Sequence, residues 1–164
     1  MSLYLIARFV HIAGAILFVG GLAARQLVRS LAAKAGDVQA LLAITQAAGR
    51  VERIMVIPGN TIVVVFGIIL ALMTKAPPLG FLQGSPTNWL LVSLVVLILG
   101  GGVVPLVFVP RGKLFEIALE QAVASGRITP ELEERLHDRT VALFHTLELA
   151  AVIFVMILMV FKPF

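Results

Sequence analysis

Cysteine is absent from this chain of 164 residues, and charged residues are scarce. Without cysteine, the chain cannot build a disulfide, a zinc–thiolate site or an iron–sulfur cluster of its own. Only 13% of the residues are charged and 60% are hydrophobic, whereas a soluble domain carries about 25% charged residues. A lipid bilayer is the solvent in which such a chain can fold. The length suits a single domain over residues 1–164.

The motifs of several common enzyme classes are missing as well. The chain has no nucleophile motif, glycine-rich phosphate loop or paired-carboxylate arrangement typical of hydrolases. Its net charge of +4 does not indicate nucleic-acid binding, because the basic residues stand mostly at the ends of apolar runs, where they set orientation and meet lipid head groups. Whether the protein is an enzyme stays open at this point.

Four apolar runs are long enough to cross a bilayer, and they predict transmembrane helices at residues 3–24, 54–73, 89–109 and 141–161. The first run is too long for a signal peptide and no basic residue precedes it, so we expect it to be retained. The pattern predicts an all-α membrane protein, an up-down bundle of four transmembrane helices with cytoplasmic helical extensions.

Capping residues predict where these extensions begin and end. Gly36 should end the first helix, and Asp37 should cap an amphipathic helix that leads into the second span. Pro58 predicts a kink at the start of that span. Thr129 followed by Pro130 marks a helix that we expect to run unbroken into the fourth span. We interpret the neighbouring pair His137 and Asp138 as a solvated surface.

Lysine and arginine counts predict the orientation. The two long connections carry ten basic residues and the opposite side carries three: Arg8, Lys75 and Lys162. The positive side of a multi-pass protein faces the cytoplasm. We therefore expect a bacterial inner (cell) membrane protein with both termini outside the cytoplasm.

A helix rises ~1.5 Å per residue, which gives an approximate depth for each residue in the membrane. By this measure, polar residues of several helices lie in one layer of the cytoplasmic half. That layer should hold Arg25, Asn60, His145 and Glu148. A carboxylate at such depth is costly and needs a partner, for which Arg25 is the first candidate and His145 the second. Two interpretations stay open: an ion-paired lock between helices, and a ligand or proton site. Gly100, Gly101 and Gly102 lie at a similar depth, and we interpret them as helix-packing residues.

His11 lies ~12 Å from the outer end of the first helix, on the face that also carries Gly14, Phe18, Gly21 and Arg25. Three interpretations stay open for it: a hydrogen bond to a neighbouring helix, a haem ligand, and a ligand of another metal. No second histidine lies at its depth. The ligand-capable residues in the outer half are Met73, Met156 and Met159, so a His–Met site would join His11 to Met156.

Three segments carry a resemblance to a known family. Residues 8–21 (RFVHIAGAILFVGG), 57–61 (IPGNT) and 156–163 (MILMVFKP) resemble a family of uncharacterised bacterial four-helix integral membrane proteins, a domain of unknown function. More distantly, the early histidine followed by small residues is similar to copper-resistance D membrane proteins and J-type protoporphyrinogen oxidases. The oxidase resemblance implies haem b on His11. The later-helix lysine of those oxidases has no counterpart inside the apolar runs.

Two functions from different classes follow. The first is a cofactor-binding membrane protein that holds haem or another redox group through His11. The second is a non-catalytic accessory or assembly subunit that packs against itself or other membrane proteins. The expected partners are therefore the lipid bilayer and a homo-oligomer or larger membrane complex, without nucleic acid.

Overall fold

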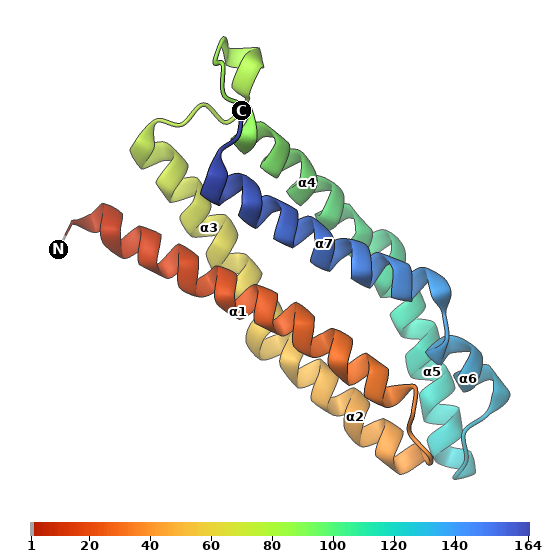
Figure 1. Ribbon diagram of the computed structural model, residues 1–164. Coiled ribbons are helices and arrows are strands. Elements are labelled where there is room, and N and C mark those ends of the chain that lie inside the picture. Colours follow the sequence, from red (N-terminus) through yellow and green to blue (C-terminus); the bar gives the residue numbers. More distant parts are fainter. Residues whose placement is uncertain (1) are drawn as a thin grey trace.

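The computed structural model describes residues 2–164, and within them it is all-helical with four helices able to span a membrane (Figure 1). These spans are Leu3–Ala32, Val38–Thr74, Trp89–Ser125 and Pro130–Phe161. The predicted all-α bundle is thus confirmed. The helices are α1 (Leu3–Ala32), α2 (Val38–Val51), α3 (Ile57–Thr74), α4 (Trp89–Val103), α5 (Val109–Ser125), α6 (Pro130–Leu136) and α7 (Arg139–Phe161).

Two π-helical turns join consecutive helices within the second and third spans. The turn η1 (Glu52–Val56) joins α2 to α3, and η3 (Val104–Phe108) joins α4 to α5. Prolines accompany both turns: Pro58 follows η1, Pro105 lies inside η3 and Pro110 follows it. Because proline lacks the amide hydrogen that an α-helix needs, a wider turn can accommodate the lost bond. The turn η1 thus lies just before Pro58, where the sequence predicts a kink. A short 3₁₀ turn, η2 (Gly80–Gln83), lies in the loop between α3 and α4.

Two of the predicted helix caps agree with the structure, but the predicted end of the first helix at Gly36 is wrong, because α1 ends at Ala32 with Ala33 as its C-cap. Asp37 accepts hydrogen bonds from Gln39 N and Ala40 N, and the hydroxyl of Thr129 accepts one from Leu132 N. However, the last helix does not run unbroken. The chain breaks at His137 and Asp138, and the side chain of Asp138 caps a new helix, α7. The prediction of an unbroken helix is wrong because the Asp138 side chain accepts hydrogen bonds from Thr140 N and Val141 N, and these bonds replace those of a continuing helix.

Glycines allow α1 and α3 to pack closely in antiparallel directions. A Cβ at Gly14 would lie 2.5 Å from Ile62, and one at Gly59 would lie 2.6 Å from the backbone nitrogen of Phe18. A Cβ at Gly21 would meet Met55 at 2.9 Å. The face predicted for the first helix is therefore the face that contacts the second span. Small residues of this kind let helix backbones approach closely in membranes.

The main buried apolar cluster lies outside the pairs of long helices. It forms where α2, α5 and α6 pack together, which we call the cap; its members are Val38, Leu41, Ala118, Leu119, Ala122 and Leu132. α1 begins and α7 ends at the opposite end of the molecule (Figure 1). The cap is thus a small conventional core attached to a set of long apolar helices.

The long helices form two pairs, with α1 beside α3 and α4 beside α7 (Figure 1). A cleft of about 2060 Å³ separates the pairs. Gly100, Gly101 and Gly102 of α4 pack against no other helix of residues 2–164, because a Cβ at any of them would meet nothing within 4 Å. The interpretation of these glycines as packing residues is therefore wrong within this chain. Gly100 and Gly101 instead line the cleft.

Candidate functional site

The cleft is lined by side chains from every span, and most of its exposed surface is apolar. Its polar lining includes both of the sites expected from the sequence. His11 lies in the part nearer the start of α1, and an ion-pair cluster lies near the cap. The two sites expected from the sequence thus open into one continuous space.

His11 makes a hydrogen bond that selects the tautomer of its neutral ring. Its Nδ1 lies 3.0 Å from the carbonyl oxygen of Val63 on α3. A carbonyl only accepts, so Nδ1 must carry the hydrogen, and the Nε2 atom of the neutral ring keeps its lone pair. Metal-ligating histidines are oriented in this way, with one ring nitrogen donating to a carbonyl and the other facing the metal.

Gly67 explains why the imidazole can reach that carbonyl. A helical side chain covers the turn on its N-terminal side, so a residue without a side chain at position 67 leaves the carbonyl of Val63 open. A Cβ at Gly67 would lie 3.2 Å from Cε1 of His11. The sequence analysis expected a neighbouring helix as one partner for His11, and the structure places that partner on α3.

Met156 of α7 lies in the wall of the same cleft as His11, as does Met159. Met156 is 42% exposed. Met73, the third methionine considered, does not line the cleft. Among residues 2–164, no cluster of three or more histidine and acidic side chains could hold a metal ion. A ligand in the cleft would therefore depend on single side chains from opposite walls.

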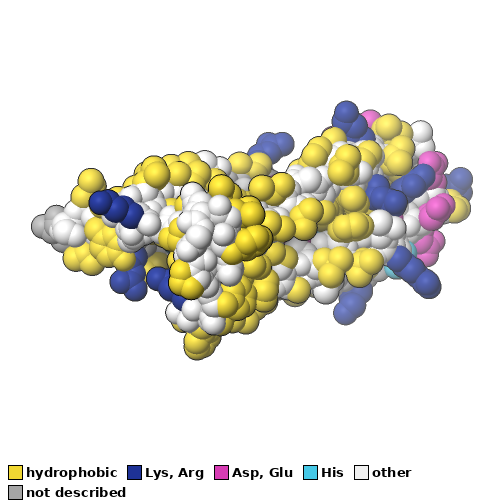
Figure 2. All heavy atoms as spheres, turned by 90° about the horizontal axis from the view of Figure 1, so that it is seen from above, with side chains coloured by type: hydrophobic (Ala, Val, Ile, Leu, Met, Phe, Trp, Pro, Cys, Tyr) yellow, Lys and Arg dark blue, Asp and Glu magenta, His cyan; other side chains and the backbone are white. Residues whose placement is uncertain are grey.

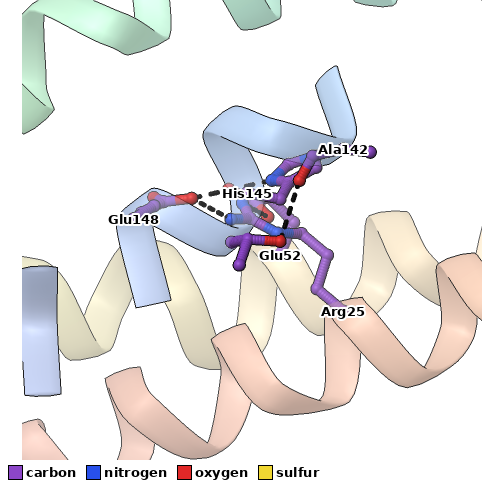
Figure 3. Close-up of polar contacts among 6 residues, drawn as sticks. Arg25, Glu52, Ala142, His145 and Glu148 are labelled. Atoms are coloured by element: carbon purple, nitrogen blue, oxygen red, sulfur yellow. Dashed lines mark hydrogen bonds and ion pairs between the residues drawn. The ribbon is translucent and has the colours of Figure 1, made fainter. Parts of the chain in front are cut away.

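Arg25 is the centre of the ion-pair cluster (Figure 3). Its guanidinium group donates to Glu148 of α7, and a second contact joins it to Glu52 at 3.1 Å. The side chains of Arg25 and Glu148 are only 15% and 19% exposed. This cluster joins α1 to α7, and so connects one helix pair to the other.

His145 adds to the cluster through two neighbours. Its Nδ1 lies 3.6 Å from Glu148 Oε2, which is an ion-pair distance rather than a hydrogen bond. Its ring stacks on Phe108, with centroids 4.3 Å apart and planes at 16°. The guanidinium carbon of Arg25 lies 5.7 Å from the centroid of the Phe108 ring, within the range of a cation–π interaction.

The structure brings together three of the four residues assigned to the polar layer: Arg25, His145 and Glu148. Asn60 lines the cleft, but its side chain makes no hydrogen bond to any residue of the described chain. Sequence reasoning missed Glu52 and Phe108, which both belong to the π-helical turns. Gly21 packs against Met55, and the two helices run in opposite directions. One turn further along α1, Arg25 therefore lies opposite Glu52, so this contact could have been predicted from the antiparallel packing. No sequence signal points to Phe108.

A second ion pair lies beside the first, where α5 meets the start of α7. Arg111 Nη1 lies 2.5 Å from Asp138 Oδ2, and Arg29 donates to the backbone carbonyl of Asp138 at 3.2 Å. The Asp138 side chain is 13% exposed. The interpretation of His137 and Asp138 as a solvated pair is therefore wrong for Asp138 and holds for the exposed His137.

A family model described as "Predicted integral membrane protein (DUF2269)" matches residues 5–163, nearly the whole chain. The chain belongs to this family. The resemblance to an uncharacterised membrane protein family is thus confirmed, and the family is defined by its membrane character rather than by an activity. No curated protein and no solved structure matches the chain. The function of this DUF2269 protein must therefore be argued from the cleft.

Proposed function

We propose that this DUF2269 protein binds a haem-type cofactor in the cleft, with Nε2 of His11 as an iron ligand. The observation that carries the proposal is the hydrogen bond from His11 Nδ1 to the Val63 carbonyl. It leaves Nε2 as a lone-pair donor on a ring held in a fixed orientation. The cleft of about 2060 Å³ exceeds the ~300–1,000 Å³ of most small-molecule sites, so a large planar group has room.

Met156 is our candidate for a second residue that would hold the cofactor. It comes from α7, in the other helix pair, and its thioether would complete a His–Met ligand set. With both residues as ligands, the cofactor would be suited to electron transfer. When bound, the haem would supply one-electron redox chemistry. The chain itself would hold the iron, shield it with apolar walls and set its orientation.

The visible absorption spectrum tests this proposal. The protein is purified in mild detergent, alone and after addition of hemin. We expect a Soret band in the wild type and in His137→Ala, which removes an exposed histidine that bonds only within α6 and its cap. The band should be lost in His11→Ala and weakened in Gly67→Leu, whose side chain would displace the imidazole. A well-folded wild-type protein that contains no haem, and whose mixture with hemin shows only the spectrum of free hemin, would contradict the proposal.

A second candidate is an accessory or assembly subunit. It is favoured by how little of each span is enclosed: 22% of the apolar window of the first span is buried, and only 6% of the third and fourth. In this case a helix of another protein, or of a second copy, would fill the cleft beside Gly100 and Gly101. Co-purification of a stoichiometric membrane partner that shields these two glycines, together with absence of haem, would favour it.

We also propose the bacterial inner membrane as the location, with the cap in the cytoplasm. The connections at the cap end carry ten of the thirteen basic residues, and the positive side faces the cytoplasm. α1 begins and α7 ends at the other end (Figure 1), which would place both termini outside. Labelling of single cysteines with an impermeant reagent in intact cells tests this, because the chain has no native cysteine.

A further inference from the structure

Charge is distributed unequally along the cleft. Every acidic residue of the sequence lies within residues 37–52 or 116–148, so the ends of the helices remote from the cap carry none. On the face seen in Figure 2, acidic side chains gather at one end of the molecule, whereas basic side chains occur at both ends. The end without acidic side chains is the end nearer His11.

Three basic side chains line the cleft at that end, and each comes from a different helix. Arg8 lies on α1, Lys75 caps the C-terminus of α3, and Lys162 caps that of α7. The ammonium group of Lys162 also lies 5.1 Å from the centroid of the Trp89 ring. We call these three residues the basic mouth.

The basic mouth differs from the arginines near the cap in having no acidic partner. Arg25 and Arg111 each pair with a carboxylate. No salt bridge within residues 2–164 includes Arg8, Lys75 or Lys162. The mouth therefore presents positive charge toward the cleft, and this charge is available to a ligand.

We infer that the basic mouth binds the carboxylate groups of the cofactor held by His11, and so fixes which edge of the cofactor faces the end of the cleft. This inference rests on the proposed function. Arg8 stands three residues before His11, on the same face of α1 and ~4.5 Å further out. A rigid planar ligand bound at His11 would reach the mouth with one edge. Its apolar edge would face the part of the cleft nearer the cap, which Gly100 and Gly101 also line.

A simpler explanation exists for two of these residues. Lysines at the ends of α3 and α7 stabilise the C-terminal helix dipoles and meet lipid head groups. That explanation requires no ligand and predicts that neutralising the lysines leaves ligand affinity unchanged. It also gives no reason for Arg8 to line the cleft from the middle of the second turn of α1.

The test compares hemin with its dimethyl ester, which keeps the iron and the ring but lacks the carboxylate charges. Both are titrated into detergent-solubilised wild type, into Arg8→Gln/Lys75→Gln/Lys162→Gln, and into Lys34→Gln. Lys34 is an exposed cation at the other end of α1 and serves as the control. We expect the triple variant to bind hemin about tenfold more weakly, as summed exposed ion pairs would give. Its affinity for the ester should be unchanged, and Lys34→Gln should bind both like the wild type.

Three results would overturn the inference. Equal loss of affinity for both ligands would indicate a general disturbance of the cleft. No loss for either would assign the three cations to lipid contact alone. A wild type that binds neither ligand would contradict the cofactor, and the basic mouth with it. Hemin binding that depends on His11 but not on the mouth leaves the proposed function standing and rejects only this inference.

Discussion

Replacing Glu148 with glutamine should destabilise the protein clearly. The change preserves shape and removes the charge that faces Arg25. Removing one partner of a buried ion pair costs about 3–5 kcal/mol, because the other charge stays buried. Here Arg25 keeps Glu52 at 3.1 Å, and this partner offsets part of the loss. We therefore expect a cost of about 2–3 kcal/mol in the free energy of unfolding.

The measurement is reversible unfolding of the purified protein in mixed micelles with increasing SDS, followed by far-UV circular dichroism. Glu52→Gln is the matched control, since the Glu52 side chain is 37% exposed and Glu148 only 19%. An exposed pair contributes about 0–1 kcal/mol, so this control should unfold close to the wild type. Equal and small effects of both changes would refute the claim that Arg25 depends on Glu148. The double variant Arg25→Met/Glu148→Met should recover most of the lost stability, because the one charge that it leaves unpaired, Glu52, is 37% exposed.

Three further predictions concern packing, capping and the cleft. Gly59→Ala should lower the free energy of unfolding by about 1–3 kcal/mol in the same assay, because the new methyl group would lie 2.6 Å from the Phe18 backbone nitrogen. Gly102→Ala should leave the free energy of unfolding unchanged, because its methyl group would meet nothing within 4 Å. Asp138→Ala should lower the free energy of unfolding by at least the ~1 kcal/mol of a lost N-cap, which would appear as a lower unfolding midpoint. An unchanged midpoint would contradict the claim that the Asp138 side chain stabilises the start of α7. Gly101→Leu should weaken hemin binding about tenfold by filling the cleft, whereas Gly102→Leu, outside the lining, should not.

Much of the fold could be predicted from the sequence because its causes are local. Apolar length determines the spans, and Asp37, Thr129 and Gly126 determine helix ends through their own side chains or backbone. The face of α1 from His11 to Arg25 could also be identified, because residues three or four apart share a side of a helix. The Arg25–Glu148 pair followed from depth counting, since a deep carboxylate requires a cation within reach.

The remaining features depend on how the helix pairs sit relative to each other, which periodicity does not encode. Gly100 and Gly101 have the composition of a packing surface, yet they face the cleft because α4 pairs with α7 rather than with α3. Glu52 joins Arg25 because a π-helical turn continues the second span toward the cap. The partner of His11 is a backbone carbonyl, which every residue possesses and which no sequence pattern marks.

The central claim is that His11 presents a free Nε2 to a haem-type ligand, and a hemin titration followed at the Soret band tests it most directly. The account predicts saturable one-to-one binding in the wild type and in His137→Ala. It predicts that binding is lost in His11→Ala, while the far-UV circular dichroism of that variant remains that of the wild type. Hemin binding of equal affinity and equal spectrum in His11→Ala and in the wild type would contradict it.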